Sequence, residues 1–159
     1  MIDAEARKTV LRMFTYGLYA LTVPDGEGGN GATVNWVTQT SFDPPLIAVS
    51  VEKSSRSIVL IRRHQGFALN IYRSDQRELA GQLGKRSANR PDKFAGVSWD
   101  AGTTGAPLLT DALGYVECSV RSEIDSGDSV IFLVEVVAAG ERNPGYPLTM
   151  ESSGFKHAG

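Results

Sequence analysis

The sequence has little of what disulfide-bonded, metal-binding and membrane-spanning proteins need. Its 159 residues include one cysteine, Cys118, and two histidines, His64 and His157. A single cysteine excludes an internal disulfide, and these three residues lack the spacing of metal ligands, so no metal site is predicted. The most apolar run, "VIFLVEVVAA" (130–139), is too short to cross a bilayer and contains Glu135. The first residues lack the apolar core of a signal sequence. We therefore expect a soluble, cytoplasmic protein without a membrane partner.

An excess of positive charge is also missing. The formal net charge is -2, whereas modules that bind nucleic acids are normally basic, so no nucleic-acid partner is expected. The chain is 42% apolar and 21% charged, which is typical of globular proteins. At this length, residues 1–159 are expected to form a single domain.

Sequence motifs for hydrolysis and for nucleotide binding are absent or incomplete. There is no G-x-S-x-G and no Walker loop. The stretch "GEGGNG" (26–31) matches G-x-G-x-x-G, but a dinucleotide fingerprint requires a helix immediately afterwards. The next stretch, "ATVNWVTQT" (32–40), has the pattern of a strand instead. The glycines therefore predict a hairpin loop.

Few side chains suit acid–base or nucleophilic catalysis. Cys118 alternates with apolar neighbours in a strand pattern, so a buried structural thiol is favoured over a nucleophile paired with His157. Glu117 and Glu135 are interpreted as surface or hydrogen-bonded acids. An enzyme with so few candidates would take its chemistry from a cofactor.

Strand patterns dominate and helices are short. Short turns between consecutive strands imply antiparallel pairing, and about six strands in one domain suggest a closed or nearly closed barrel. The fold class expected is therefore mainly β, with a few short peripheral helices. The tail is expected to add at most one edge strand. The expected strands cover 18–23, 32–40, 46–52, 67–72, 112–124 and 129–140, and the expected helices cover 3–14, 56–64 and 75–84, the last capped by Asp75 and Glu78.

A cluster of small hydroxyl and basic residues comes after the strand 46–52. Lys53, Ser54, Ser55 and Arg56, followed by Ser57, lead into an expected helix. Their hydroxyl groups, the guanidinium and the helix N-terminus together suit an anion. A serine here can equally cap the helix, and the two roles are compatible.

The run "TVNWVTQTSFDPPLIAVSVEKSSRS" (33–57) resembles the signature of the flavin reductase-like, FMN-binding split-barrel family. Four later segments agree with that family in order: "GFALNIYRSDQRELA", "DKFAGVSW", "GAPLLTDALGYVEC" and "GDSVIFLVEVVAAG". The resemblance implies an antiparallel barrel with Greek-key strand order, a homodimer, and a bound FMN or FAD.

The resemblance also implies which residues hold the cofactor. One group lines the isoalloxazine ring largely through main-chain atoms, a second lies along the ribityl chain, and a third binds the phosphate. These groups are Thr33, Val34, Asn35 and Trp36, then Ser50 and Val51, and then Ser54, Ser55, Arg56 and Ser57. Trp36 could instead be an ordinary barrel or dimer-interface aromatic. Phe94 resembles a position near the cofactor, with a role in the core as the alternative. Asn70 needs a polar partner inside its apolar strand, either flavin or backbone.

Two further residues are candidates near the flavin and the nicotinamide. Members of the family that use a nicotinamide often carry "GDH" where this chain reads Gly127-Asp128-Ser129. Ser129 either faces the site or belongs only to the hairpin turn. Near the end of the sequence, Phe155 and His157 either fold over the site or form a frayed terminus.

The function implied is an FMN-dependent NAD(P)H:flavin reductase that transfers hydride to flavin N5. FMN is favoured over FAD because no adenine site can be identified. A monooxygenase or another protein would accept the electrons. Two alternatives remain: an FMN-binding electron carrier of the flavoredoxin type without a nicotinamide site, and a non-catalytic flavin-binding barrel.

Overall fold

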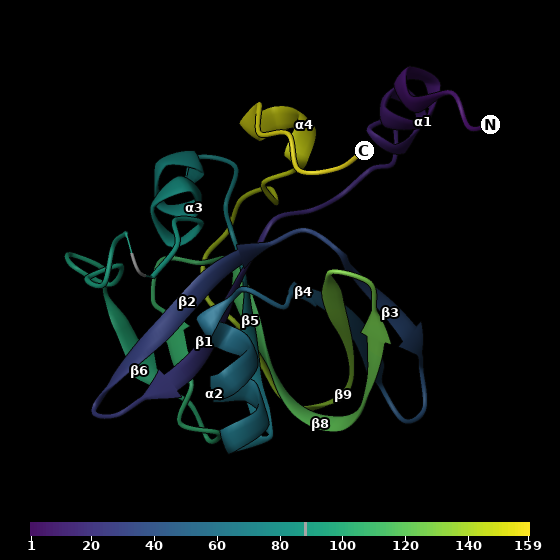
Figure 1. Cartoon of the computed structure of the whole chain (residues 1–159). Helices are drawn as coiled ribbons and strands as arrows, with labels where there is room; N and C mark the ends of the chain where they lie inside the picture. Colours follow the sequence, from purple (N-terminus) through teal and green to yellow (C-terminus); the bar gives the residue numbers. More distant parts are fainter. Residues whose placement is uncertain (88) are drawn as a thin grey trace.

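The computed structural model describes residues 1–87 and 89–159. It contains a large antiparallel sheet with short helices at its periphery (Figure 1). The mainly β class is confirmed, with slightly more strands than expected. The elements in chain order are α1 (Ala4–Leu11), β1 (Tyr19–Asp25), β2 (Gly28–Val34), β3 (Val37–Ser41), β4 (Leu46–Glu52), α2 (Arg56–His64), β5 (Gly66–Ile71), α3 (Arg77–Leu83), β6 (Trp99–Ala101), β7 (Pro107–Leu109), β8 (Gly114–Ser126), β9 (Ser129–Glu141) and α4 (Met150–Ser153).

The order of the strands forces the main sheet to curl. The sheet contains seven strands in the order β2-β1-β5-β8-β9-β4-β3, so β2 and β3 are its two edges. In a flat sheet these edges would lie about 29 Å apart, because neighbouring strands are spaced about 4.8 Å. Yet only Asn35 and Trp36 separate β2 from β3, and three Cα–Cα steps span at most about 11 Å. The sheet therefore closes into a barrel whose edges meet at this link but are not paired along their length.

The barrel interior is filled by apolar side chains that alternate along the strands. Leu21 and Val23 of β1 and Phe67 and Leu69 of β5 all face inward and are almost completely buried. Helix α2 closes one end, because its apolar stripe joins the same core. That stripe consists of Ile58, Leu60 and Ile61.

The outer face of β1 and β5 carries a buried polar anchor, Asn70, which is fully buried. Its amide nitrogen donates to Ala20 O at 3.2 Å and to Thr22 Oγ1 at 3.1 Å. Its carbonyl oxygen accepts from Leu109 N at 2.8 Å. The partners of Asn70 are therefore backbone groups and one hydroxyl. Of the two partners considered for Asn70, flavin or backbone, the structure shows the backbone. Through these bonds β7 is held against the barrel.

Several local expectations were wrong at their boundaries. The expected strand 32–40 is two strands, β2 and β3, and the glycines of "GEGGNG" mostly lie within β2. Among the glycines of this stretch, only Gly26 has a positive φ, 63°. The turn between β1 and β2 is therefore shorter than the number of glycines suggested.

Helix α3 does not have the expected capping box. Gln76 is its N-cap and makes no side-chain cap bond. The carboxylate of Asp75 pairs instead with Arg73, at 2.9 Å. Because the side chain of Gln76 bonds Arg73 N and Asp111 O, it joins the helix start to a later loop.

The two ends of the chain contain little regular structure apart from helices α1 and α4. The tail forms isolated bridges, Gly17 with Thr149 and Arg73 with Pro147, followed by α4, and adds no strand. Helix α1 forms with Asp3 as N-cap, as expected, but none of its residues is buried. None of the helices in the described part of the chain has the length and apolar character that crossing a bilayer needs.

The first prediction concerns the anchor. Replacing Asn70 by Leu should lower the free energy of unfolding by about 3 kcal/mol, because each buried polar group left unpaired costs about 1–3 kcal/mol. The control is Thr38→Val on the exposed side of edge strand β3, which should change stability by less than about 0.5 kcal/mol. Denaturant unfolding measures both. Equal stability of the two variants would contradict the anchoring role.

The second prediction concerns the single thiol. Cys118 is fully buried, and burial together with the nearby charge of Glu117 raises its pKa to about 12. At pH 8 only about one molecule in ten thousand carries the reactive thiolate. The native protein should not react with dithiobis(nitrobenzoate), whereas the protein unfolded in guanidinium should release one thiol per chain. Rapid reaction of the native protein would show that Cys118 is accessible.

Candidate functional site

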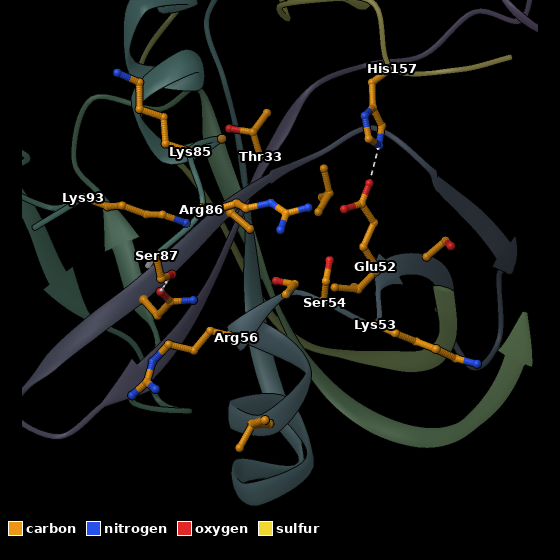
Figure 2. Close-up of a pocket in the computed structure, with 18 of the residues that line it drawn as sticks. Thr33, Glu52, Lys53, Ser54, Arg56, Lys85, Arg86, Ser87, Lys93 and His157 are labelled. Atoms are coloured by element: carbon orange, nitrogen blue, oxygen red, sulfur yellow. Dashed lines mark hydrogen bonds and ion pairs between the residues drawn. The ribbon is translucent and has the colours of Figure 1, made fainter. Parts of the chain in front are cut away.

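A cavity of about 870 Å³ opens along the seam between the edge strand β2 and the end of β4 (Figure 2). This volume is within the range of about 300–1,000 Å³ that small-molecule and cofactor sites occupy. Its lining comes from β2, from the end of β4, from the start of α2, from the loop after α3 and from His157. The lining residues predicted from the sequence are Thr33, Val34, Asn35, Trp36, Ser50, Val51, Ser54, Ser55, Arg56 and His157.

The wall formed by β2 offers main-chain hydrogen-bonding groups. β2 pairs with β1 on one side and is an edge of the sheet on the other. β4 pairs with β3 only as far as Val49, beyond which Ser50 N donates to Trp36 O at 3.0 Å. A sheet edge presents a row of N–H and C=O groups that no neighbouring strand uses. The seam can therefore bind a planar polar molecule without dedicated side chains.

The side chain of Thr33 is committed to the scaffold. Its hydroxyl donates to Ala80 O at 2.5 Å, so the contact with the hydroxyl of Tyr72, 2.9 Å away, is one that Thr33 accepts. Burial raises the pKa of Tyr72 far above its usual value, which keeps this phenol a donor. Thr33 thus fixes β2 to α3, and only its main chain remains for a ligand.

The start of α2 faces the cavity as an ordered group of donors. Ser55 is the N-cap, and its hydroxyl accepts from Ser57 N at 3.2 Å. Ser57 is fully buried beneath the cavity and outside its lining, where its hydroxyl accepts from Asn30 Nδ2 at 3.2 Å. Asn30 in turn accepts from the hydroxyl of Ser87, at 3.0 Å. The capping role of Ser55 is confirmed, and Ser57 joins α2, β2 and the loop after α3.

Arg56 lines the cavity but is engaged with a carboxylate. Its Nε and Nη2 donate to Asp25 at distances of 2.8–3.0 Å in a bidentate pair. Both side chains are partly exposed. The pair is therefore close to neutral, and the guanidinium does not face the cavity as an isolated charge.

Three basic residues of the lining were missed in the sequence: Lys85, Arg86 and Lys93, which come from the segment after α3. Lys53, which belongs to the predicted basic cluster, also lines the cavity and pairs with Asp125. The signal was the basic run "GKRSANRPDK" (84–93) directly after a helix. Its position on the cavity wall depends on how α3 packs against β2, which no local pattern reveals.

A cluster of aromatic and polar side chains closes the end of the cavity away from α2. The ring of His157 lies 5.5 Å from that of Trp36, centre to centre, and its Nε2 is 3.2 Å from Glu52 Oε1. Asn35 Nδ2 donates to the backbone oxygen of His157 at 3.0 Å. The segment around His157 therefore folds over the cavity, as Figure 2 shows for the His157–Glu52 contact.

Two candidate residues lie elsewhere. Phe94 packs in the second apolar cluster, with its ring 6.1 Å from that of Trp99. Ser129 is buried opposite Glu52 in the β4–β9 ladder, and its hydroxyl donates to Asp128 at 3.1 Å. Neither residue lines the cavity.

Comparison with known proteins agrees with this architecture. Residues 11–159 match the family model described as flavin reductase like domain. A high molecular weight rubredoxin from Moorella thermoacetica is 38% identical over 87% of this chain, which spans 62% of that protein's length. A reductase subunit of a flavin-dependent monooxygenase from Rhodococcus jostii is 32% identical over 92% of this chain and 74% of its own length.

A solved structure extends the likeness to three dimensions. An NADH:FAD oxidoreductase from Streptomyces globisporus, in complex with NAD and FAD fragments, superimposes with a TM-score of 0.84 at 27% identity. The match covers 99% of this chain and 95% of that one. With a family model that spans nearly the whole sequence, this chain belongs to the flavin reductase-like domain family.

Proposed function

We propose that this chain is a flavin-binding oxidoreductase that reduces a flavin nucleotide with NAD(P)H in the seam cavity. The observation that supports the proposal is the order in which different kinds of groups follow one another along this cavity. One end has the aromatic ring of Trp36, the other end has basic side chains and a helix N-terminus, and a sheet edge runs between them. A flavin nucleotide has the same sequence of groups: a flat polar ring, a hydroxylated chain and a phosphate.

Each wall would hold one part of the nucleotide. The main chain of residues 33–36 and the ring of Trp36 would contact the isoalloxazine. Ser50 and Val51 would line the ribityl chain, while Ser54, Ser55 and Arg56 would lie at the phosphate end. The flavin supplies the hydride-accepting N5, and the protein supplies orientation and exclusion of water.

Two titratable groups considered for catalysis, Cys118 and Glu117, lie outside the cavity. Cys118 lies in the barrel core. Burial opposes ionisation of Glu117, but hydrogen bonds from Thr104 and Thr103 outweigh it, so its pKa is below the usual value. That carboxylate holds the loop before β7 and does not line the cavity.

The known relatives support the proposal. The Rhodococcus protein is a reductase subunit of a monooxygenase, and the Streptomyces structure contains NAD and FAD fragments. We propose FMN as the preferred flavin, NADH or NADPH as the donor, and a monooxygenase or another protein as the electron acceptor. A homodimer with the cavity near its interface is part of the same proposal.

A second candidate is an FMN electron carrier without a nicotinamide site. The 38% identity with the Moorella rubredoxin favours it, and the match covers 62% of that protein's length. In such a protein the flavin domain would receive electrons from another domain or protein.

The third prediction separates these functions. The purified chain is titrated with FMN and FAD, and the complex is then mixed with NADH or NADPH without oxygen. We expect a flavin to bind and its visible absorbance to bleach on addition of at least one nicotinamide. Absence of flavin binding would refute the proposal. Binding without bleaching by either nicotinamide would favour the electron carrier.

The fourth prediction tests the ring end. Trp36→Ala should raise the Kd of riboflavin and of FMN by the same factor, about fivefold, because an aromatic contact is worth about 1 kcal/mol. The control is Trp99→Phe, since Trp99 packs against Phe94 outside the cavity, and it should leave both values unchanged. Equilibrium binding of each flavin provides the measurement. A loss of affinity for FMN with unchanged affinity for riboflavin would show that Trp36 does not contact the isoalloxazine ring.

A further inference from the structure

A short segment, residues 156–158, lies at the Trp36 end of the cavity, and we call it the strap. The ring of His157 is 5.5 Å from that of Trp36, centre to centre, and belongs to the cavity lining. The strap contains no helix or strand. It directly follows Phe155, which packs against the second apolar cluster and whose ring centre is 4.9 Å from the guanidinium carbon of Arg77. Phe155 therefore anchors the point from which the strap extends.

Three polar contacts hold the strap in place. Asn35 Nδ2 donates to the backbone oxygen of His157 at 3.0 Å, and His157 Nε2 is 3.2 Å from Glu52 Oε1 (Figure 2). Arg12 Nε donates to the backbone oxygen of Ala158 at 3.0 Å. The side chains of His157 and Glu52 are about half exposed, and contacts between exposed charged groups stabilise a structure only slightly. The strap has no large apolar side chain to bury, so it belongs to the parts of a protein that open locally at low cost.

The outer support of the strap is a helix that is itself loosely attached. Arg12 is the C-cap of α1, which has no buried residue. Gly159, directly after the strap, lies against the backbone of Lys8 in the same helix, and Figure 1 shows this end of the sequence beside α1. Among the described residues, the apolar clusters include no side chain of α1 or of the strap. The strap and α1 can therefore move without disturbing the core of the barrel.

We propose that the strap is a gate: it closes the Trp36 end of the cavity, and it moves aside to admit the ring of a planar ligand. Only the identity of that ligand, the isoalloxazine of a flavin, rests on the proposed function. While His157 lies beside Trp36, its imidazole takes up space at the end where the flavin ring is proposed to bind. Opening also releases the carboxylate of Glu52 and the amide of Asn35, which are an acceptor and a donor at the same end.

The fifth prediction follows the opening of the strap without any ligand. The chain has two tryptophans, so a Trp99→Phe background leaves Trp36 as the source of indole fluorescence. The rate constant for collisional quenching by acrylamide, obtained from fluorescence lifetimes, measures how accessible Trp36 is. His157→Ala and Arg12→Met should each raise this constant by about twofold or more, because each removes one of three weak contacts.

The two variants separate movement of the strap from simple shielding. Arg12 lies outside the cavity lining, and Arg12→Met leaves the imidazole of His157 in the chain, so a rise in this variant reports displacement of the strap. The matched controls are Arg7→Met on the same helix and His64→Ala, both at exposed positions outside the cavity, and they should leave the constant unchanged. A constant that stays at the unmodified value in either His157→Ala or Arg12→Met would overturn the inference.

Flavin binding tests the consequence of opening. FMN is mixed rapidly with each protein, and association is followed by flavin fluorescence. His157→Ala and Arg12→Met should raise the association rate constant about two- to fivefold, because a larger fraction of molecules has an open site. Unchanged association in variants whose indole is more accessible would also overturn the gate. If neither the unmodified chain nor the variants bind a flavin, the proposed function fails, whereas the quenching experiment still decides whether the strap moves.

Discussion

The link of two residues between β2 and β3 is the constraint on which the rest of the structure depends. It joins opposite edges of a seven-stranded sheet, so the sheet must curl until these edges meet. The link is too short for the edges to be far apart, yet β2 and β3 do not form a ladder with each other. The barrel is consequently closed in shape, while the edge strand β2 has no partner strand along the cavity. In a typical sheet such an edge is a liability; here the cavity lies along it.

The polar groups along this seam are ordered from one end to the other. At the Trp36 end, the ring of His157 and the carboxylate of Glu52 close the cavity. At the opposite end, helix α2 serves two purposes, because its apolar stripe fills the barrel while its first turn faces the cavity. A displacement of α2 would disturb the core and the site together. This coupling explains why hydroxyl residues directly precede a strongly apolar helical stripe in the sequence.

The sequence allowed prediction of whatever depends on local pattern. Local residue patterns predicted strands that correspond to β1, β4, β5, β8 and β9 and a helix that corresponds to α2. The family resemblance of residues 33–57 named a group of residues that, except for Ser57, line one cavity, although strand pattern alone would not have brought them together. The capping box expected at Asp75 failed because a tertiary bond of Gln76 to Asp111 O determines the helix start instead. Lys93 and Arg86 were missed because their place depends on packing between segments distant in sequence. The pairing of Arg56 with Asp25 was invisible for the same reason.

The described residues between α3 and β8, 84–87 and 89–113, show how a segment with little regular structure can carry precise positions. Its far part is held by Glu117, which accepts from Thr103 and Thr104, and by Asn70, which accepts from Leu109 N. Its near part is held by Gln82, whose amide donates to the backbone oxygen of Lys93 at 2.6 Å. Buried polar groups of this kind tolerate few alternative arrangements, because each unpaired partner is costly. The anchor on helix α3, Gln82, thus fixes the backbone from which the cavity-lining ammonium of Lys93 extends. Binding groups on a rigid scaffold retain their geometry even when they lie in loops, and here the rigidity comes from side chains that never reach the cavity.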